Sequence, residues 1–294
     1  MRLPMKLSRV ALLILVSAMR VTAQDTTHTA NLRPTLEGRI AQVVLCDGSS
    51  LFGRVTDVTA TTVRLASSVG DVSIPRSSIA SVKQVDATAI HDGQIWPEDP
   101  SRTRLFFAPT GRMLRTGEDY FADAYIFFPS LQYGVTDRVT IGGGMSVFPG
   151  AGLDEQLYYV TPKVSVYATP GVNVAVGVLA AGAKSISDQT PVGLGYGVAT
   201  FGGEDASVTT GAGFGFSRAK ASSAAVLMLG GSQRVSKSVA LVSENYYFST
   251  GSGELLFSGG TRFMGDRLAV DIALIGCSSC GLVLAPYLSF IYRW

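Results

Sequence analysis

Residues 267–294 read RLAVDIALIGCSSCGLVLAPYLSFIYRW, and this stretch decides the fold. In its first eight residues every second side chain is large and apolar, and those between are small or charged. The large ones are Leu268, Val270, Ile272 and Leu274, and the others include Arg267, Ala269 and Asp271. Residues 282–294 repeat the pattern. Because successive side chains of a β-strand point to opposite faces, the two-residue period predicts two strands, each with one bulky, uncharged face.

The same pattern continues through most of the chain and predicts twelve strands. They are 102–112, 119–135, 138–148, 157–169, 172–184, 191–202, 206–217, 223–235, 238–249, 254–264, 267–276 and 282–294. Such lengths suit strands that cross a bilayer at a tilt, whereas strands of soluble proteins are usually about five or six residues long. In 191–202 we expect Val192, Leu194, Tyr196 and Val198 on the bulky face and glycines on the other. Segments 223–235 and 238–249 alternate too poorly for their faces to be assigned.

The connections between these strands also alternate, in length. The tight ones are Thr136-Asp137, Pro170-Gly171, Gly203–Asp205, Ser236-Lys237 and Gly265-Asp266, and the others are 113–118, 149–156, 185–190, 218–222, 250–253 and 277–281. Short turns on one side and longer loops on the other are typical of membrane-spanning barrels. The sequence therefore predicts an all-β fold, an antiparallel transmembrane β-barrel of about 12 strands over residues 102–294. An even strand number places residue 102 and the C-terminus on the same side.

Helices are the alternative to this prediction. Residues 164–183 and 272–292 carry no charge and are long enough to span a bilayer as helices. The first run contains Pro170-Gly171, and the second contains Pro286, which suit turns and strand ends better than helix centres. A lipid-facing helix also has no need for bulk at every second residue. We therefore expect strands in both runs.

The N-terminal third predicts export and a separate small domain. Residues 1–23 have the basic start, short apolar run and small terminal residues of a signal peptide. Residues 24–35 are expected to be a disordered lead-in, and 86–101 a linker. Between them, 36–85 carry short β-branched runs separated by Asp-Gly and Gly-Asp turns, which predict a small β-domain of about five strands.

Composition narrows the classes of partner and site. Charged residues make up 16% of the chain and the net charge is +2, so neither a polyanion nor a nucleic-acid partner is expected. Cys277 and Cys280 are close enough in sequence for a disulfide in an exported protein, and two unpaired loop thiols remain the alternative. Both histidines, His28 and His91, are far from this pair, which disfavours a zinc site.

Two motifs resemble known families. The pattern DG-x4-GRV, beginning at Asp47, resembles a small Sm-like or SH3-like barrel, and for an exported domain it implies protein contact or a structural plug. The stretch from Arg104 to Gly144, with YGVTDR at 133–138, resembles uncharacterised Gram-negative outer-membrane β-barrels. That resemblance implies an outer-membrane location and contact with outer-membrane lipid. With short turns on the periplasmic side, the even strand number then places the N-terminal domain in the periplasm, where we expect a protein partner.

The C-terminus carries a further resemblance. The alternating aromatic residues Phe290, Tyr292 and Trp294 are similar to the signal that the barrel-assembly machinery recognises at the end of many such proteins. Their physical role is that of an aromatic girdle at the membrane interface. The resemblance therefore implies that the assembly machinery is a partner.

The chemistry of the barrel region argues against an enzyme. It contains no histidine, and Lys163 has no serine near it in sequence to activate, so we expect no catalysis, no cofactor and no metal. The candidate functional residues are charges that the alternation places in the lumen. They are Lys163, Glu254, Arg262 and Asp271, with Glu244 on a strand of less regular alternation.

Two interpretations of these charges stay open. They line a polar path for solutes, or they pair across the interior and close it. The expected function is a structural outer-membrane barrel or a passive, narrow channel for small solutes. The alternative is a membrane-anchored interaction module that acts through residues 36–85.

Overall fold

A computed structural model describes residues 36–67, 70–85, 89–91, 94–182, 192–217, 220–249, 253–280 and 283–294. The predicted signal peptide, the lead-in and His28 lie outside the described residues. The chain divides into two compact units, Met1–Gly93 and Gln94–Trp294. Within the described ranges, no helix has the length and apolar character needed to cross a bilayer.

The first unit is a five-stranded antiparallel sheet in the order β4-β3-β2-β1-β5. Its elements are β1 (Ile40–Leu45), β2 (Ser50–Val58), β3 (Thr62–Ser67), β4 (Gly70–Pro75), the 3-10 turn η3 (Arg76–Ser78) and β5 (Ile79–Gln84). Val43, Val55 and Leu65 are fully buried between the strands. Two very short strands follow, β6 (Ile90–His91) and β7 (Gln94–Ile95), the second of which belongs to the next unit.

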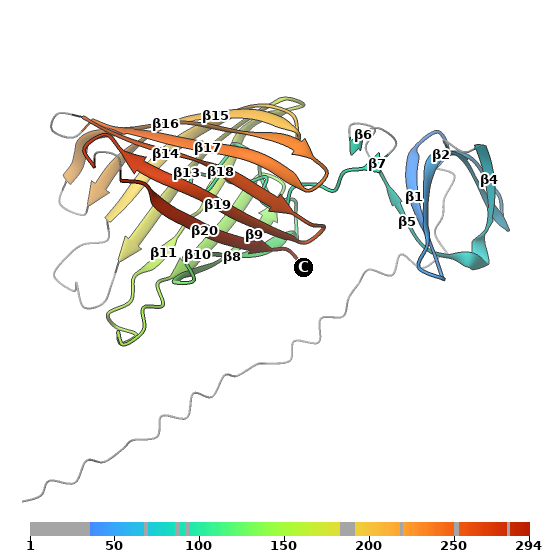
Figure 1. Cartoon of the computed structure of the whole chain (residues 1–294), viewed down its shortest axis with the longest axis horizontal. Helices are drawn as coiled ribbons and strands as arrows, with labels where there is room; N and C mark the ends of the chain where they lie inside the picture. The colour runs from blue at the N-terminus through green and yellow to red at the C-terminus, as the bar shows by residue number, and fades with distance from the viewer. Residues whose placement is uncertain are drawn as a thin grey trace, which may run out of the picture. The chain divides into compact units, whose positions relative to one another are not determined.

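The second unit is a closed antiparallel barrel (Figure 1). Its strands are β8 (Asp119–Ala124), β9 (Phe128–Thr136), β10 (Val139–Met145), β11 (Tyr158–Val160), β12 (Lys163–Thr169), β13 (Val172–Gly182), β14 (Val192–Gly202), β15 (Ala206–Ser217), β16 (Lys220–Ser236), β17 (Val239–Phe248), β18 (Glu254–Met264), β19 (Leu268–Cys277) and β20 (Ala285–Tyr292). Strand β20 pairs with β8, which closes the ring. Strands β11 and β12 both lie between β10 and β13, separated by Thr161-Pro162, so they share one position and the wall has twelve strands.

The two faces of the wall differ as the alternation predicts. On β19, Leu268, Ile272 and Leu274 are exposed, whereas Ala269, Asp271 and Ala273 are buried. Other strands add further exposed apolar side chains, which include Ile141, Val164, Val166, Val176, Val208, Leu227, Leu241, Leu255 and Leu288. Monomeric soluble proteins rarely expose contiguous apolar patches larger than a few hundred Å². The outer face of this barrel therefore has the character of a surface that contacts lipid.

Two sequence predictions about the strands are wrong, although twelve is the number observed. Residues 102–112 form no strand of the wall, and residues 119–135 form two strands instead of one. These two strands, β8 and β9, are separated by a turn in which Tyr125 and Ile126 take left-handed backbone conformations, with φ of 58° and 68°. No glycine or proline marks this turn, so the sequence offered no ordinary signal for it. The two errors cancel in the count.

The expected faces of residues 191–202 are also reversed. Val198 is buried in the apolar cluster inside the barrel, and Tyr196 packs against that cluster. Side-chain size distinguishes the lipid-facing side of a strand from its lumen side only where small or polar side chains fill the lumen. At the level of Val198 an inserted segment makes the interior apolar, so bulky residues occur on the inner face as well.

Candidate functional site

Residues 97–117 lie inside the barrel, and we call them the luminal hairpin. The chain reverses at Phe106 and Phe107, where the amide of Leu105 donates to the carbonyl oxygen of Ala108 at 2.8 Å. Most of its side chains are buried, among them Ser101, Arg102, Thr103, Leu105, Phe106, Ala108, Thr110 and Leu114. The tip of the hairpin joins an apolar cluster with wall residues Ala124, Ala175, Val198, Met228, Val242, Ala273 and Tyr287. These residues come from strands β8, β13, β14, β16, β17, β19 and β20, so the tip of the hairpin packs against much of the inner wall.

Glu244 on β17 holds the tip of the hairpin. Its carboxylate accepts hydrogen bonds from the amide groups of Phe106 at 2.7 Å and of Phe107 and Ala108 at 3.0 Å each. The Tyr246 hydroxyl donates to the same carboxylate at 2.6 Å. Consecutive amide groups that converge on one anion form a backbone nest. A buried carboxylate is tolerated here because hairpin amides supply its partners.

Lys163 on β12 holds the two arms of the hairpin. Its ammonium group donates to the carbonyl oxygens of Arg112 at 2.7 Å, Thr110 at 3.1 Å and Thr103 at 3.3 Å. These three acceptors use all three N–H donors of the lysine. Thr103 precedes the reversal of the chain, and the other two follow it. Lys163 therefore links both arms of the hairpin to the wall.

Arg262 on β18 forms the third link. It donates to the Asp271 carboxylate at 2.6 and 3.1 Å, to Asp99 at 2.9 Å and to the carbonyl oxygen of Leu105 at 2.7 Å. Ser289 also donates to Asp271, at 3.1 Å. Arg262, Asp271 and Ser289 each have 1% of their surface exposed. A charge pair this deeply buried is tolerable because hydrogen bonds satisfy both members.

Two glycines lie at close contacts between the hairpin and the wall. A Cβ at Gly111 of the hairpin would lie 2.0 Å from the carbonyl oxygen of Asn173. A Cβ at Gly230 on β16 would lie 2.6 Å from the Leu105 side chain. A larger residue at Gly111 would force the hairpin away from β13, and one at Gly230 would meet both the Leu105 side chain and the carbonyl oxygen of Ser243 on β17.

A cluster of ion pairs surrounds the base of the hairpin. Glu98 pairs with Arg102 and Arg115 at 2.7 Å each and with Arg293 at 3.2 Å. Glu118 pairs with Arg102 and, at 3.0 Å, with Arg293. Burial of Glu98 opposes its ionisation, but the positive charges of Arg102, Arg115 and Arg293 outweigh that effect and lower its pKa to about 2. Arg293 follows β20, so this cluster connects the hairpin to the C-terminal end of the wall.

A cavity of about 390 Å³ remains between the luminal hairpin and strands β8 to β14. Its walls are rich in aromatic side chains, and its charged lining residues are both cations. The aromatic residues are Phe106, Phe107, Tyr120, Tyr125, Phe128, Tyr159 and Tyr196, and the cations are Arg104 and Lys163.

Three of the four residues predicted for the lumen lie around the hairpin. Lys163, Arg262 and Asp271 are buried and contact it directly or through one another. Glu254 lies at the other end of β18 and accepts a hydrogen bond from Ser279. Sequence reasoning missed Asp99 and the hairpin itself. The signal available was residues 102–112, where arginines and the Leu105–Phe107 run do not alternate like the strands that follow.

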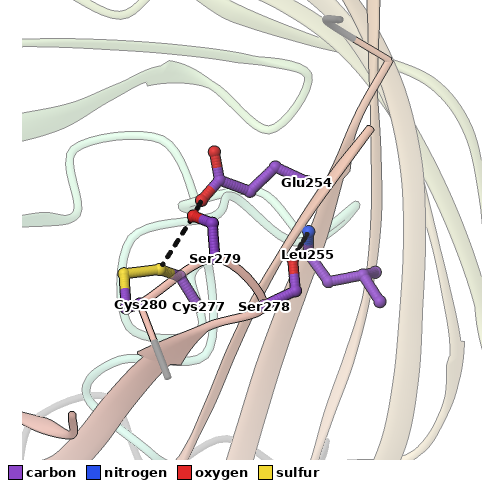
Figure 2. The surroundings of a disulfide bond; sticks show 6 residues. All are labelled: Glu254, Leu255, Cys277, Ser278, Ser279 and Cys280. Carbon is purple, nitrogen blue, oxygen red and sulfur yellow. Dashed lines mark hydrogen bonds between the residues drawn. A yellow bond between two sulfur atoms is a disulfide. The ribbon is translucent and has the colours of Figure 1, made fainter. Parts of the chain in front are cut away.

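Cys277 and Cys280 form a disulfide at the end of β19 (Figure 2). Figure 2 also shows Ser278, whose hydroxyl accepts a hydrogen bond from the amide of Leu255 at 3.0 Å, so this loop is attached to β18. Glu254 and the two sulfur atoms lie within 4.8 Å of one another. Sulfurs joined in a disulfide are not thiolate ligands, so the oxidised loop is not a metal site.

The predicted terminal signal lies at the end of β20. Tyr292 is 41% exposed and Trp294 52% exposed, and their rings stack with centroids 6.3 Å apart. Phe290 is partly buried and packs against Phe121 on β8, with ring centroids 5.8 Å apart. The aromatic residues thus gather at the seam where the barrel closes.

Comparisons with known proteins give likenesses of structure. No protein-family model matches the chain, and no curated protein matches it. The KdgM porin in complex with disordered oligogalacturonate is similar at 11% identity and a TM-score of 0.47, over 60% of this chain and 98% of that chain. The NanC porin is similar at 9% identity and a TM-score of 0.42, over 60% and 97%. Outer-membrane expressed OmpT of Vibrio cholerae has 13% identity and a TM-score of 0.34, over 87% and 95%. With every TM-score below 0.5, we base no conclusion on these likenesses.

Proposed function

We propose that this protein is an outer-membrane β-barrel that provides a narrow path for small solutes, restricted by its luminal hairpin. The observation that carries the proposal is a closed twelve-stranded wall with an apolar outer face and a charged, hydrogen-bonding lumen. A closed barrel leaves no unpaired strand edge, which is what a bilayer requires of a β-structure. The apolar outer side chains would contact outer-membrane lipid.

Orientation follows from the topology. The tight turns, the base of the hairpin and the C-terminus belong to one end of the wall. In outer-membrane barrels the short turns face the periplasm. On this basis the small N-terminal domain is periplasmic, available to a protein partner. Phe290, Tyr292 and Trp294 would serve as the signal for the barrel-assembly machinery.

The charged residues of the lumen have a role in this proposal that differs from either sequence interpretation. Lys163, Glu244 and Arg262 bind the backbone of an inserted segment, and Arg262 and Asp271 pair with each other across neighbouring strands. They would set the width of the path by holding the hairpin in place. We also propose that the protein is not an enzyme and needs no cofactor, because the barrel sequence contains no histidine to act as a base.

Planar-bilayer recording of the refolded protein tests this proposal, alongside a heat-modifiability gel that reports a folded barrel. We expect small, steady conductance steps. A folded barrel without any conductance, in repeated insertions, would refute the channel. It would favour the alternative of a membrane-anchored interaction module that acts through residues 36–85.

A further inference from the structure

Arg104 in the luminal hairpin is a partly buried cation with no carboxylate partner among the described residues. Its guanidinium group donates one hydrogen bond, to the Ser289 hydroxyl at 3.1 Å. Its Nε atom is buried and has no hydrogen-bond partner among the described residues. No carboxylate of the described residues forms an ion pair with it, in contrast to Arg102 of the same hairpin, which pairs with Glu98 and Glu118. A buried Nε–H without an acceptor is costly, and a ligand oxygen at this point would remove that cost.

Arg104 lines the 390 Å³ cavity together with Lys163. The lining contains no acidic side chain, so its charged groups are both cations. The three donors of Lys163 are already used by hairpin carbonyl oxygens, which leaves Arg104 as the residue free to bind an incoming anion. A planar guanidinium group matches the two oxygens of a carboxylate.

Seven aromatic side chains line the cavity beside Arg104. Three of them, Phe106, Phe107 and Tyr125, pack against the buried ring of Tyr287, which lies behind the lining; the Tyr125 and Tyr287 ring centroids are 5.2 Å apart. Tyr125 reaches this position from a residue with φ of 58°, a conformation that non-glycine residues adopt at some cost. Such strain often occurs where a binding surface requires it.

We infer that this cavity binds a small aromatic carboxylate, with its carboxylate on Arg104 and its ring among the aromatic side chains. The cavity volume falls within the range of small-molecule sites, about 300–1,000 Å³. Hydroxyl and amide groups of Tyr120, Thr161 and Gln132 at the wall give polar contacts for substituents. The inference goes beyond the proposed channel, since binding requires the folded barrel and does not require conduction.

Calorimetric titration of the refolded protein in neutral detergent with 2-naphthoate tests the inference. We expect saturable binding with one site per chain and at least about tenfold weaker binding of the uncharged 2-naphthamide, because a hydrogen bond to a charged group is stronger than one to a neutral group. This comparison needs no variant. Arg104→Gln should weaken naphthoate binding by about 10- to 100-fold, and Arg104→Lys by less. The matched control is Arg138→Gln, an exposed arginine in a turn, which should leave binding unchanged.

Three results would overturn the inference. One is the absence of saturable naphthoate binding to protein that the gel shows to be folded. Another is equal affinity for naphthoate and naphthamide. The third is binding of dodecanoate in preference to naphthoate, which would identify an acyl-chain site. Conductance is recorded on the same preparations, so failure of the channel and failure of the site are separate outcomes.

Discussion

Replacing Glu244 with glutamine should loosen the luminal hairpin while leaving the wall intact. The Glu244 carboxylate accepts hydrogen bonds from three successive hairpin amides, and glutamine keeps the shape of the side chain without its charge. Hydrogen bonds to charged groups contribute about 1.5–3 kcal/mol and neutral ones about 0.5–1.5 kcal/mol. The substitution therefore removes about 3 kcal/mol of stabilisation from the three hydrogen bonds. Part of this loss is offset because a charge is no longer buried. We expect a net loss of about 1–3 kcal/mol, or roughly 5- to 150-fold in the hairpin's docked population.

Hydrogen–deuterium exchange read by mass spectrometry measures this change directly. Peptides from residues 97–117 should exchange faster in the Glu244→Gln protein by the same factor, because their amides are released from the nest. Peptides from β18 and β19 should exchange at the rate of the unaltered protein. The Glu254→Gln variant is the matched control, since it makes the same chemical change on the next strand and away from the hairpin. Unchanged exchange of 97–117 in the Glu244→Gln protein would refute the view that this carboxylate holds the hairpin.

Three further predictions concern the base of the hairpin, the buried charge pair and the loop disulfide. Because the pKa of Glu98 is lowered from 4.5 to about 2, its ion pairs stabilise the protein fully above pH 4.5 and are lost as the pH falls towards 2. The temperature at which the folded barrel is lost on a heat-modifiability gel should decrease as the pH is lowered from 4.5 to 2. Glu98→Gln should remove this pH dependence. Arg262→Met should lower the free energy of unfolding in urea by about 3–5 kcal/mol, because it leaves Asp271 buried and unpaired. Thiol titration of unfolded, unreduced protein should find one free thiol, Cys46, since Cys277 and Cys280 are paired.

Each of these predictions has a control or a contradicting result. A pH-independent melting temperature between pH 2 and 4.5 would contradict the first. Arg267→Met, in an exposed turn, should change the unfolding free energy by less than about 0.5 kcal/mol, and an equal effect of both arginine variants would contradict the second. Three titrated thiols would contradict the third.

The wall of the barrel was predictable because its signal is local. The two-residue alternation on β19 and the tight turns, such as Pro170-Gly171, are readable from neighbouring residues alone. The inward position of Asp271 follows from the same local pattern, whereas the sequence left open whether Cys277 and Cys280 pair. These features required no knowledge of which distant segments meet.

The luminal hairpin was not predictable in this way, because its conformation is set by contacts distant in sequence. Phe106 and Glu244 are 138 positions apart, and no periodicity connects them. The apolar run Leu105–Phe107 has the composition of a strand, so the sequence favoured a wall position for it. The faces of β14 were predicted the wrong way round for the same reason, since the hairpin makes the interior apolar where Val198 lies.

The central claim is that the barrel contains a path that its luminal hairpin restricts. Single-channel conductance of the unaltered protein and of Glu244→Gln, recorded in the same bilayer and salt, tests this claim most directly. The account predicts small steps for the unaltered protein and larger or more frequent openings for the variant. Two folded, heat-modifiable proteins with identical conductance, or with none, would contradict it.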